Sequence, residues 1–346
     1  MKTAVCCVSV AILFAACQLP EPHSYIMTVN GPLSVEEMGK SLIHEHVFLD
    51  WTGADSINPA AWDSDAAFAA ILPYLTQASE KGVLTMLECT PAYLGRNPAL
   101  LKKLSDSSGI HILTNTGYYG ARKNKYIPAP AFSLSVDNLA AIWVDEWENG
   151  ISGTSVKPGF IKIGVDSDSV LSGMHEKIVK AAARAHLHTG LTIVGHTGPD
   201  APAFAQIALL REEGVDPSAF VWTHAQQGTM ASHVKAASMG AWVSLDGMGW
   251  MAPDSVNDPQ ALTVARYVEM ITNMRENHQL RRLLISHDAG WYTFGEPEGG
   301  KYQPYTAIFD QVIPALKVAG FSEDELTQLL VNNPAEAYQI RVRRVD

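Results

Sequence analysis

Short apolar stretches alternate with amphipathic stretches along most of this chain. An amphipathic stretch such as HEKIVKAAARAHLHTG ends at Gly190, the residue type that commonly follows the last turn of a helix. The apolar stretches are short enough to be buried strands. There are eight of them: Ser41–Leu49, Gly82–Cys89, Ile110–Thr116, Gly159–Val165, Leu191–His196, Phe220–His224, Gly240–Leu245 and Arg282–Asp288.

This alternation predicts an α/β fold in which the strands pair in parallel. Because eight strand–helix units are expected and no linker or repeat divides them, we expect the sheet to close as a (β/α)8 TIM barrel. The length of 346 residues fits one such barrel, which takes ~250 residues before insertions. We therefore predict a single barrel domain over residues 29–346, with its functional site at the C-terminal ends of the strands.

The first residues differ in composition from the rest of the chain. Lys2 precedes an apolar run that is too short for a membrane-spanning helix of ~20 residues, which is the layout of a secretory signal peptide over residues 1–16. The stretch FAAC resembles the cleavage site of bacterial lipoproteins, which would make Cys17 the lipidated first residue of the mature chain. A plain signal peptide cleaved nearby is the alternative. Residues 17–28 then form a short linker.

This N-terminus predicts an exported bacterial protein, either periplasmic or anchored to a membrane as a lipoprotein. Any membrane contact is expected only through the lipid on Cys17. Three of the four cysteines lie in the N-terminal segment, so only Cys89 remains in the body and the fold has no internal disulfide. The formal charge of −11 argues against binding nucleic acid through its phosphates.

Polar residues that can bind metals stand at the ends of several predicted strands. His44 and His46 are two residues apart in LIHEHVFLDW, so in a strand they share one face while Glu45 points to the other. Imidazole and carboxylate ligands suit Zn²⁺, Mn²⁺, Co²⁺ or Fe²⁺. The candidates at the predicted strand ends are His44, His46, Lys162, His196, His224 and Asp288.

Lys162 is the unusual member of this set, because it lies within the apolar stretch GFIKIGVD. Burying an unpaired ammonium is costly, so burial favours the neutral amine. A neutral amine can react with carbon dioxide to give a carbamate, an anionic ligand with two oxygens. The alternatives are that Lys162 reaches solvent at the strand end or pairs with a carboxylate such as Glu88.

The sequence resembles the phosphotriesterase family of the amidohydrolase superfamily. The resemblance rests on HEH, IK, KAAARAHLHTGLTIVGHTG, VWTH and LISHD in this order, and on GVLTMLECTPAYLGR and ILTNTGYYG. It implies two divalent metals, zinc being expected, with His44, His46 and Asp288 on the more buried one and His196 and His224 on the other. N6-carboxylysine at Lys162 and a hydroxide would bridge them, and Asp288 would also accept the proton of the hydroxide.

Further residues near the predicted strand ends are candidates for contact with a substrate or with the metal ligands. The resemblance places Tyr119 in an aromatic substrate pocket, and Trp291 lies in the eighth loop, where packing against the barrel rim is the alternative role. Glu88 and Asp246 are candidates for hydrogen bonds that orient the ligand imidazoles. A salt bridge in the barrel mouth is the alternative for both.

Two positions depart from the family pattern. Gln227 stands where many members have Asp, and Gly247 stands where phosphotriesterases have His and lactonases often have Arg. Because both departures weaken a proton relay, we expect an enzyme in which the bridging hydroxide attacks a small lactone, carboxylic ester or amide. The alternatives are phosphotriester or phosphodiester hydrolysis at the same metals, and a lipid-anchored metal-containing binding protein without turnover. A small-molecule substrate is the expected partner, and a homodimer is a habit of the family.

Overall fold

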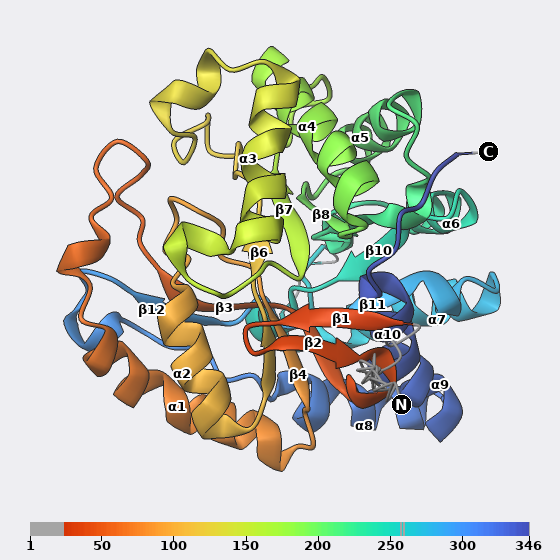
Figure 1. Cartoon of the computed structure of the whole chain (residues 1–346). Coiled ribbons are helices and arrows are strands. Elements are labelled where there is room, and N and C mark those ends of the chain that lie inside the picture. The colour runs from red at the N-terminus through yellow and green to blue at the C-terminus, as the bar shows by residue number, and fades with distance from the viewer. Residues whose placement is uncertain (1–23, 257, 259, 346) are drawn as a thin grey trace, which may run out of the picture.

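The computed structural model describes residues 24–256, 258 and 260–345. The signal peptide at 1–16 and Cys17 lie outside the described residues. Eight parallel strands occupy the middle of the molecule, and helices surround them (Figure 1). The strands are β3 (Ser41–Leu49), β4 (Thr85–Glu88), β5 with β6 (His111–Leu113 and Asn115–Thr116), β7 (Phe160–Gly164), β8 (Ile193–His196), β9 (Phe220–Thr223), β10 (Trp242–Leu245) and β11 (Leu283–Ile285).

Each strand is followed by a helix, as the alternation of patterns predicts. The helices that follow the first seven strands are α1 (Ser64–Glu80), α2 (Pro98–Ser108), α3 (Val136–Asn149), α4 (Gly173–Thr189), α5 (Asp200–Glu212), α6 (Met230–Ser238) and α7 (Val264–Glu276). The C-terminal part holds α8 (Ile313–Val318), α9 (Glu323–Thr327) and α10 (Asn333–Tyr338). Helix α4 ends at Gly190, which adopts a left-handed conformation with φ of 75°. No described helix is long and apolar enough to span a membrane.

The strands form two hydrogen-bonded arcs, with the orders β6-β7-β8-β9-β10-β11 and β5-β4-β3-β12. Strands β5 and β6 are consecutive along the chain and separated only by Thr114, so they join the arcs on one side. On the other side, the Asp288 amide donates to the His44 carbonyl at 3.0 Å, and the His46 amide donates to Ala289 at 2.8 Å. This is the fold of a TIM barrel.

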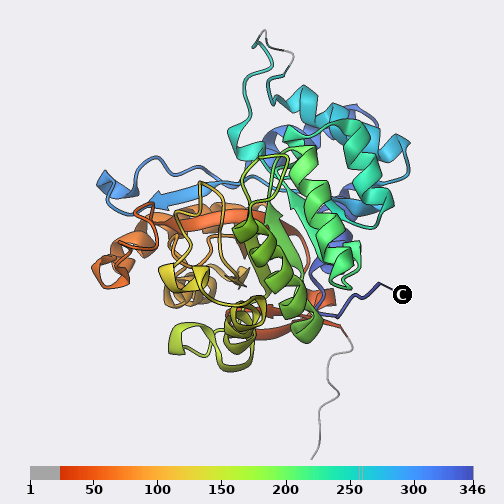
Figure 2. The same ribbon diagram turned by 90° about the horizontal axis from the view of Figure 1, so that it is seen from above.

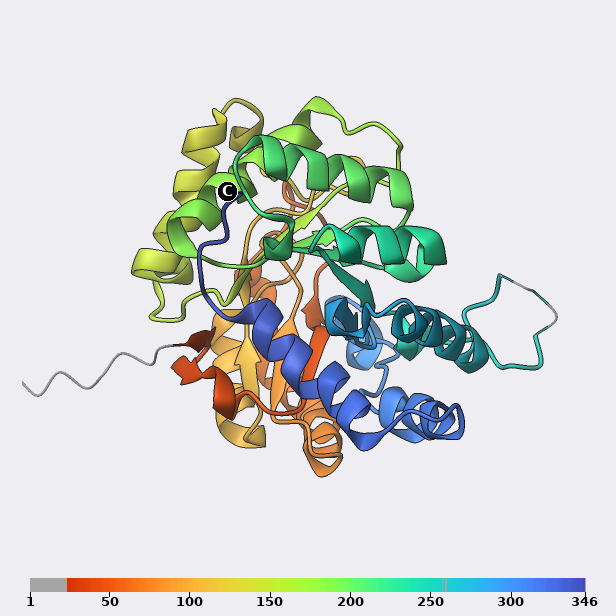
Figure 3. The ribbon, with the colours of Figure 1, turned by 90° about the vertical axis from the view of Figure 1, so that its right-hand side faces the viewer.

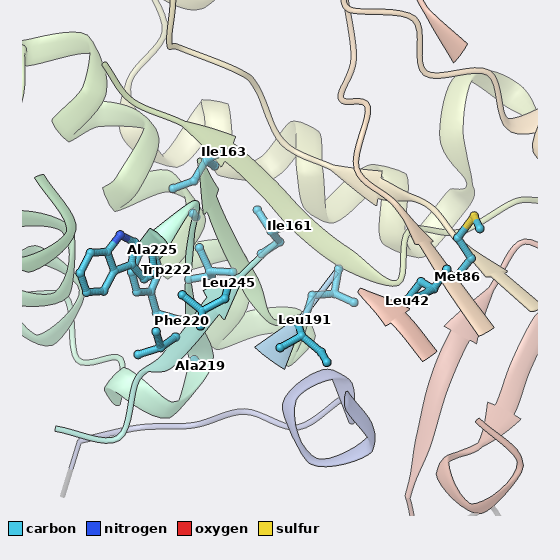
Figure 4. Packing of buried hydrophobic residues seen from close by; sticks show 14 of the residues in the cluster. Leu42, Met86, Ile161, Ile163, Leu191, Ala219, Phe220, Trp222, Ala225 and Leu245 are labelled. Carbon is cyan, nitrogen blue, oxygen red and sulfur yellow. The ribbon is translucent and has the colours of Figure 1, made fainter. Parts of the chain in front are cut away.

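Two of the three clusters of buried apolar residues form most of the core, and the third, small one includes Tyr119 and Tyr126. The smaller cluster takes one side chain from each of the eight strands, in keeping with alternate strand residues facing the barrel interior. These side chains are Ile43, Leu87, Leu113, Phe160, Val194, Val221, Trp242 and Leu284. The larger cluster lies between strands and helices, where Ile161, Phe220, Trp222 and Leu245 lie among the labelled side chains of Figure 4.

Three elements were not expected from the sequence. Strand β1 (Tyr25–Thr28) and strand β2 (Gly31–Ser34) form an antiparallel hairpin, although the sequence assigned residues up to 28 to a linker. Ile26 of this hairpin joins the interior cluster together with Tyr338 of α10. Both elements therefore cover the end of the barrel at which strands such as β7 and β10 begin. Strand β12 (Gly290–Thr293) pairs in parallel with β3 directly after the eighth strand.

One loop and the described C-terminal segment lie outside the barrel. The described part of the connection from β10 to α7 projects beyond the rest of the molecule (Figure 2). After α10, the C-terminal segment runs past the ends of α4 and α5 (Figure 3). There the Arg341 amide donates to the Gly190 carbonyl at 3.1 Å, and the Val345 amide donates to the Gly214 carbonyl at 3.1 Å.

Candidate metal centre

The strand ends bring together all six candidate ligands in one pocket. His44, His46, Lys162, His196, His224 and Asp288 line it together. His44, Lys162, His46 and His224 are buried, while His196 is half-buried. A register shift between Leu42 and Glu45 interrupts the pairing of β3 with β4 where the two histidines enter the interior. Such irregularities re-aim side chains beside functional sites.

One group of ligand atoms gathers around Asp288. Asp288 Oδ1 lies 3.2 Å from His46 Nε2 and 3.8 Å from His44 Nε2. This carboxylate oxygen is buried and accepts no hydrogen bond among the described residues. Two imidazole nitrogens facing such an oxygen are a donor set that fits a divalent transition metal.

A second group of ligand atoms surrounds His224. His224 Nε2 lies 2.8 Å from His196 Nδ1, and Lys162 Nζ lies 3.2 Å from His44 Nε2. Lys162 is only 1% exposed, so it does not reach solvent, and no carboxylate lies within ion-pair distance of it among the described residues. Unprotonated imidazole nitrogens that face each other can both bind one metal ion. The nitrogens of His196 and His224 therefore form a second donor set that fits a metal.

Asp246 ties the two groups together. Its Oδ2 accepts from His44 Nδ1 at 2.9 Å and its Oδ1 accepts from His224 Nδ1 at 2.8 Å. In both imidazoles the other nitrogen, Nε2, therefore faces the remaining candidate ligands. The His224 amide and the Ser244 hydroxyl also donate to this carboxylate. Fixing the orientation of an imidazole through its outer nitrogen is how proteins prepare a histidine for a metal.

Charge and burial set the protonation of these groups. Burial and the positive charge of Lys162 lower the pKa of His44 to about 4. Burial and the neighbouring His224 hold the pKa of His196 well below its usual value. Burial alone would raise the pKa of Asp246, but His224 and His44 outweigh it and hold that pKa well below the usual range. Burial also acts on His224, but the Asp246 carboxylate outweighs it and raises the pKa of that imidazole. The pocket therefore combines neutral His44 and His196 with carboxylates, the protonation states that bind metals.

Two of the candidate ligands have unusual backbone conformations. His224 and Asp288 have φ values of 56° and 53°. These values lie in the left-handed region, which residues other than glycine rarely adopt. Each such residue costs on the order of 1 kcal/mol and persists where the surrounding structure enforces it, commonly at functional sites. Both lie at strand ends, where the chain turns to aim the side chain into the pocket.

Aromatic residues form the wall of the pocket. The Tyr119 ring lies 4.9 Å from the His196 ring, and the Trp291 ring lies 5.8 Å from the His46 ring. Trp291 continues to the ring of Trp51 at 5.5 Å. Burial raises the pKa of Tyr119, so its hydroxyl stays protonated and can donate a hydrogen bond. The structure therefore places both sequence candidates for substrate contact beside ligand histidines.

Sequence reasoning missed Thr90, which takes the place expected for Glu88. His46 Nδ1 lies 2.8 Å from Thr90 Oγ1, whereas Glu88 Oε1 accepts from the backbone amides of Val47 and Thr90. Burial raises the pKa of Glu88. Thr90 lies two residues beyond the end of β4, where functional residues of such a barrel are expected, and this position could have identified it.

Two further residues at the mouth of the pocket were also missed. Trp51 and Arg122 line it together with the histidines. Arg122 follows the third strand in GYYGARKNK, and Trp51 ends the LIHEHVFLDW stretch. Their position after strand ends is the signal that could have identified them.

The fold and this pocket define a class: TIM-barrel hydrolases that work with metal ions. The sequence profile of the phosphotriesterase family matches residues 24–338. The chain therefore belongs to the phosphotriesterase family, whose members use a binuclear metal site.

Individual relatives agree with this assignment. The chain is 29% identical to the phosphotriesterase homology protein of Escherichia coli over 89% of this chain and 100% of that protein. It is 25% identical to human N-acetyltaurine hydrolase over 90% of this chain and 97% of that one. A mutant organophosphorus hydrolase from Deinococcus radiodurans superposes with a TM-score of 0.80 at 27% identity, covering 91% of this chain and 97% of that chain.

Proposed function

We propose that this protein is a binuclear metal hydrolase that cleaves a carboxylic ester, lactone or amide in a small molecule. The observation that carries the proposal is the convergence of six ligand side chains from β3, β7, β8, β9 and the segment after β11 on one pocket. Asp246, which holds the outer nitrogens of His44 and His224, adds the support that such ligands need.

The ligand atoms divide into two sets. His44 Nε2, His46 Nε2 and Asp288 would hold one metal, and His196 and His224 would hold the other. We propose that Lys162 Nζ attacks the carbon of carbon dioxide and loses one proton, which gives an anionic carbamate between the two sets. The burial of Lys162 without a carboxylate partner among the described residues supports this assignment, because burial favours the neutral amine that reacts with carbon dioxide.

The chemistry follows from the metals and from the residues around them. Divalent metals bound in such a pair polarise a carbonyl oxygen and lower the pKa of water, so that a nucleophile forms at neutral pH. Asp288 would bind a metal through Oδ1, which faces the two imidazoles, and its other carboxylate oxygen can take up the proton that the nucleophile loses. It can then return this proton to the leaving alkoxide or amine. Tyr119 and Trp291 would pack against the substrate and exclude water.

The residues that replace the family relay favour carbonyl substrates over phosphotriesters. Gln227 is exposed, and among the described residues its side chain makes no hydrogen bond to a candidate ligand. At Gly247, an added Cβ would lie 2.5 Å from Gln226 Nε2 and 2.7 Å from the Tyr267 hydroxyl, so the longer side chains of relatives would have to displace these groups. Without that relay, a leaving group must be protonated by Asp288 or by water.

A substrate panel tests this proposal. Protein loaded with zinc, manganese or cobalt is assayed with an aryl ester, a long-chain lactone, an N-acyl amide and an aryl dialkyl phosphate. We expect two metals per chain by elemental analysis, and a higher kcat/KM for at least one carbonyl substrate than for the phosphate. Phosphotriester hydrolysis is the second candidate function, because the structural relative from Deinococcus radiodurans is named for organophosphorus hydrolysis. Loaded protein that is inert to the whole panel would favour a binding protein instead.

We also propose that the chain is exported and lipidated at Cys17. The support is the apolar segment with FAAC at its end, which precedes the described residues. Mass spectrometry of the protein from membrane fractions should find a diacylated N-terminal Cys17, and Cys17→Ser should move the protein to the soluble periplasmic fraction. An unmodified mature N-terminus elsewhere would contradict lipidation. A homodimer is also proposed, to be tested by light scattering.

A further inference from the structure

We propose that Arg122 binds an anionic group of the substrate, so that the enzyme prefers esters or amides that carry a carboxylate or a sulfonate away from the cleaved bond. This inference rests on the proposed function, because it assigns a substrate class to the same pocket. It comes from the position of Arg122, which neither the ligand set nor the resemblance explains.

Arg122 stands at the mouth of the pocket that holds the candidate metal ligands. Its guanidinium carbon lies 4.5 Å from the centre of the Trp51 ring. Trp51 contacts Trp291, and Trp291 contacts His46, so a row of rings leads from the guanidinium to the metal ligands. Stacking on an aromatic ring restricts an arginine while leaving its N–H groups free to donate.

The charge of this guanidinium is not neutralised by the protein. Among the described residues, no carboxylate lies within 4.0 Å of the Arg122 guanidinium, although the guanidinium groups of other arginines, such as Arg96 and Arg184, have such partners. Burial raises the pKa of Tyr119, and the positive charge of Arg122 is the strongest opposing influence. Arg122 is exposed, and its positive charge influences Tyr119, which lines the same pocket, in a protein whose net charge is −11.

The backbone around Arg122 is held in an uncommon conformation. Arg122, Lys123 and Asn124 have φ values of 58°, 57° and 60°, three consecutive residues in the left-handed region. Asp166 accepts from the Arg122 amide at 2.7 Å and from the Lys123 amide at 3.2 Å, and the Asn124 amide donates to the Gly120 carbonyl at 2.9 Å. Such strain persists where the surrounding structure enforces it.

The anchor of this turn belongs to the strand that carries Lys162. Asp166 comes two residues after the end of β7, so the same strand fixes both a candidate ligand and the turn of Arg122. The result is a guanidinium at a set position relative to the metal ligands. A substrate with an anion at one end and a carbonyl at the other would span the two sites.

Three para-nitrophenyl esters of similar length separate this proposal from a neutral pocket: the valerate, the glutarate monoester and the sulfobutyrate. The measured quantity is the ratio of kcat/KM for each anionic ester to that for the valerate, in metal-loaded protein. Arg122→Gln should lower one or both ratios by about 10- to 100-fold, the range expected for a charged hydrogen bond. Which ratio falls more tells carboxylate from sulfonate recognition. Lys123→Gln removes the same charge from an adjacent exposed residue outside the pocket and should leave both ratios unchanged.

A binding measurement keeps the inference testable if the proposed hydrolysis fails. Glutarate monoamide and neutral glutaramide are titrated calorimetrically into loaded wild type and Arg122→Gln. If no ester is hydrolysed but Arg122→Gln weakens the anion selectively, the proposed function fails and the anion site stands. If both ratios stay unchanged in Arg122→Gln, and the affinities for the two amides fall equally or not at all, the anion site is refuted.

Discussion

Glu45 accepts a hydrogen bond from Nδ1 of His287 at 2.8 Å, and both side chains are fully buried. The same carboxylate accepts from the Ser286 hydroxyl and from the Ala289 amide. Glu45 thus points away from the pocket that His44 and His46 face, and holds the segment on either side of Asp288. Glu45, which is not a candidate metal ligand, therefore fixes the position of Asp288, which is one.

Glu45→Gln should displace Asp288 and lower metal occupancy. An amide has one acceptor oxygen and would face the Ala289 amide or the His287 ring with a donor, leaving a buried group unsatisfied. We expect a loss of about 1–3 kcal/mol in the free energy of unfolding and fewer than two metals per chain by elemental analysis. Glu37→Gln, at an exposed position, is the control. Full occupancy with an unchanged kcat in Glu45→Gln would show that the segment needs no such anchor.

Asp246→Asn should weaken both metals together, because Asp246 contacts a histidine of each set. The amide would present N–H groups to at least one Nδ1–H and turn that imidazole. Removing such a partner typically costs 10- to 100-fold in metal affinity, so about this loss is expected at both sites. Competition with a chelator measures it, and Asp168→Asn in an exposed loop is the control. A loss confined to one metal would mean that Asp246 does not support both ligands.

Lys162→Ala should lose metal and activity together, because it removes the proposed anionic bridge between two dications. Added acetate or propionate should restore part of both, since a short carboxylate can occupy the space of the carbamate. Metal content and hydrolysis are followed against carboxylate concentration, with the exposed Lys301→Ala as control. Near-normal turnover with two bound metals in Lys162→Ala would rule out the carbamate assignment.

The fold was predictable where hydrophobic patterns are strong. The eight apolar stretches coincide with the eight barrel strands, and the helix before Gly190 ends where the glycine indicates. Strand β12 was not predicted, because its residues, GWYT, follow the eighth strand too closely to form a separate apolar stretch in the sequence. The hairpin of β1 and β2 was not predicted, because its strands have only four residues each and one of them contains a proline. Strands this short do not show a clear period of two in the sequence.

The candidate site was predictable only in part, for a physical reason. Strand ends and the alternation of side chains identify ligands such as His44 and His196, because these rules depend on local sequence. Contacts such as that between Thr90 and His46 join residues 44 positions apart, and their geometry is set by the twist and register of the barrel. The same holds for Arg122, whose left-handed turn depends on Asp166, a residue from another strand.

The stability of the protein should depend on pH through His186, which does not line the metal pocket. Its Nδ1 donates to the Leu191 carbonyl at 2.9 Å, and its Nε2 accepts from the Arg343 amide at 2.9 Å, so the folded protein holds a neutral imidazole. Burial lowers the pKa of His186 from 6.5 to about 4. A proton on Nε2 would abolish the hydrogen bond from the Arg343 amide and would face that amide with a second donor, although the Arg343 carbonyl lies 3.2 Å from the same nitrogen.

Because the unfolded chain binds this proton more readily, the contribution of His186 is fully present above pH 6.5 and is lost as the pH falls towards 4. The loss should reach about 3 kcal/mol, since each pKa unit corresponds to about 1.4 kcal/mol. Denaturant unfolding of wild type and His186→Gln between these pH values measures it. Glutamine can donate and accept but does not titrate, so the stability difference should be largest at neutral pH and shrink with acid. A constant difference across the range would show that the pKa of His186 does not change on unfolding.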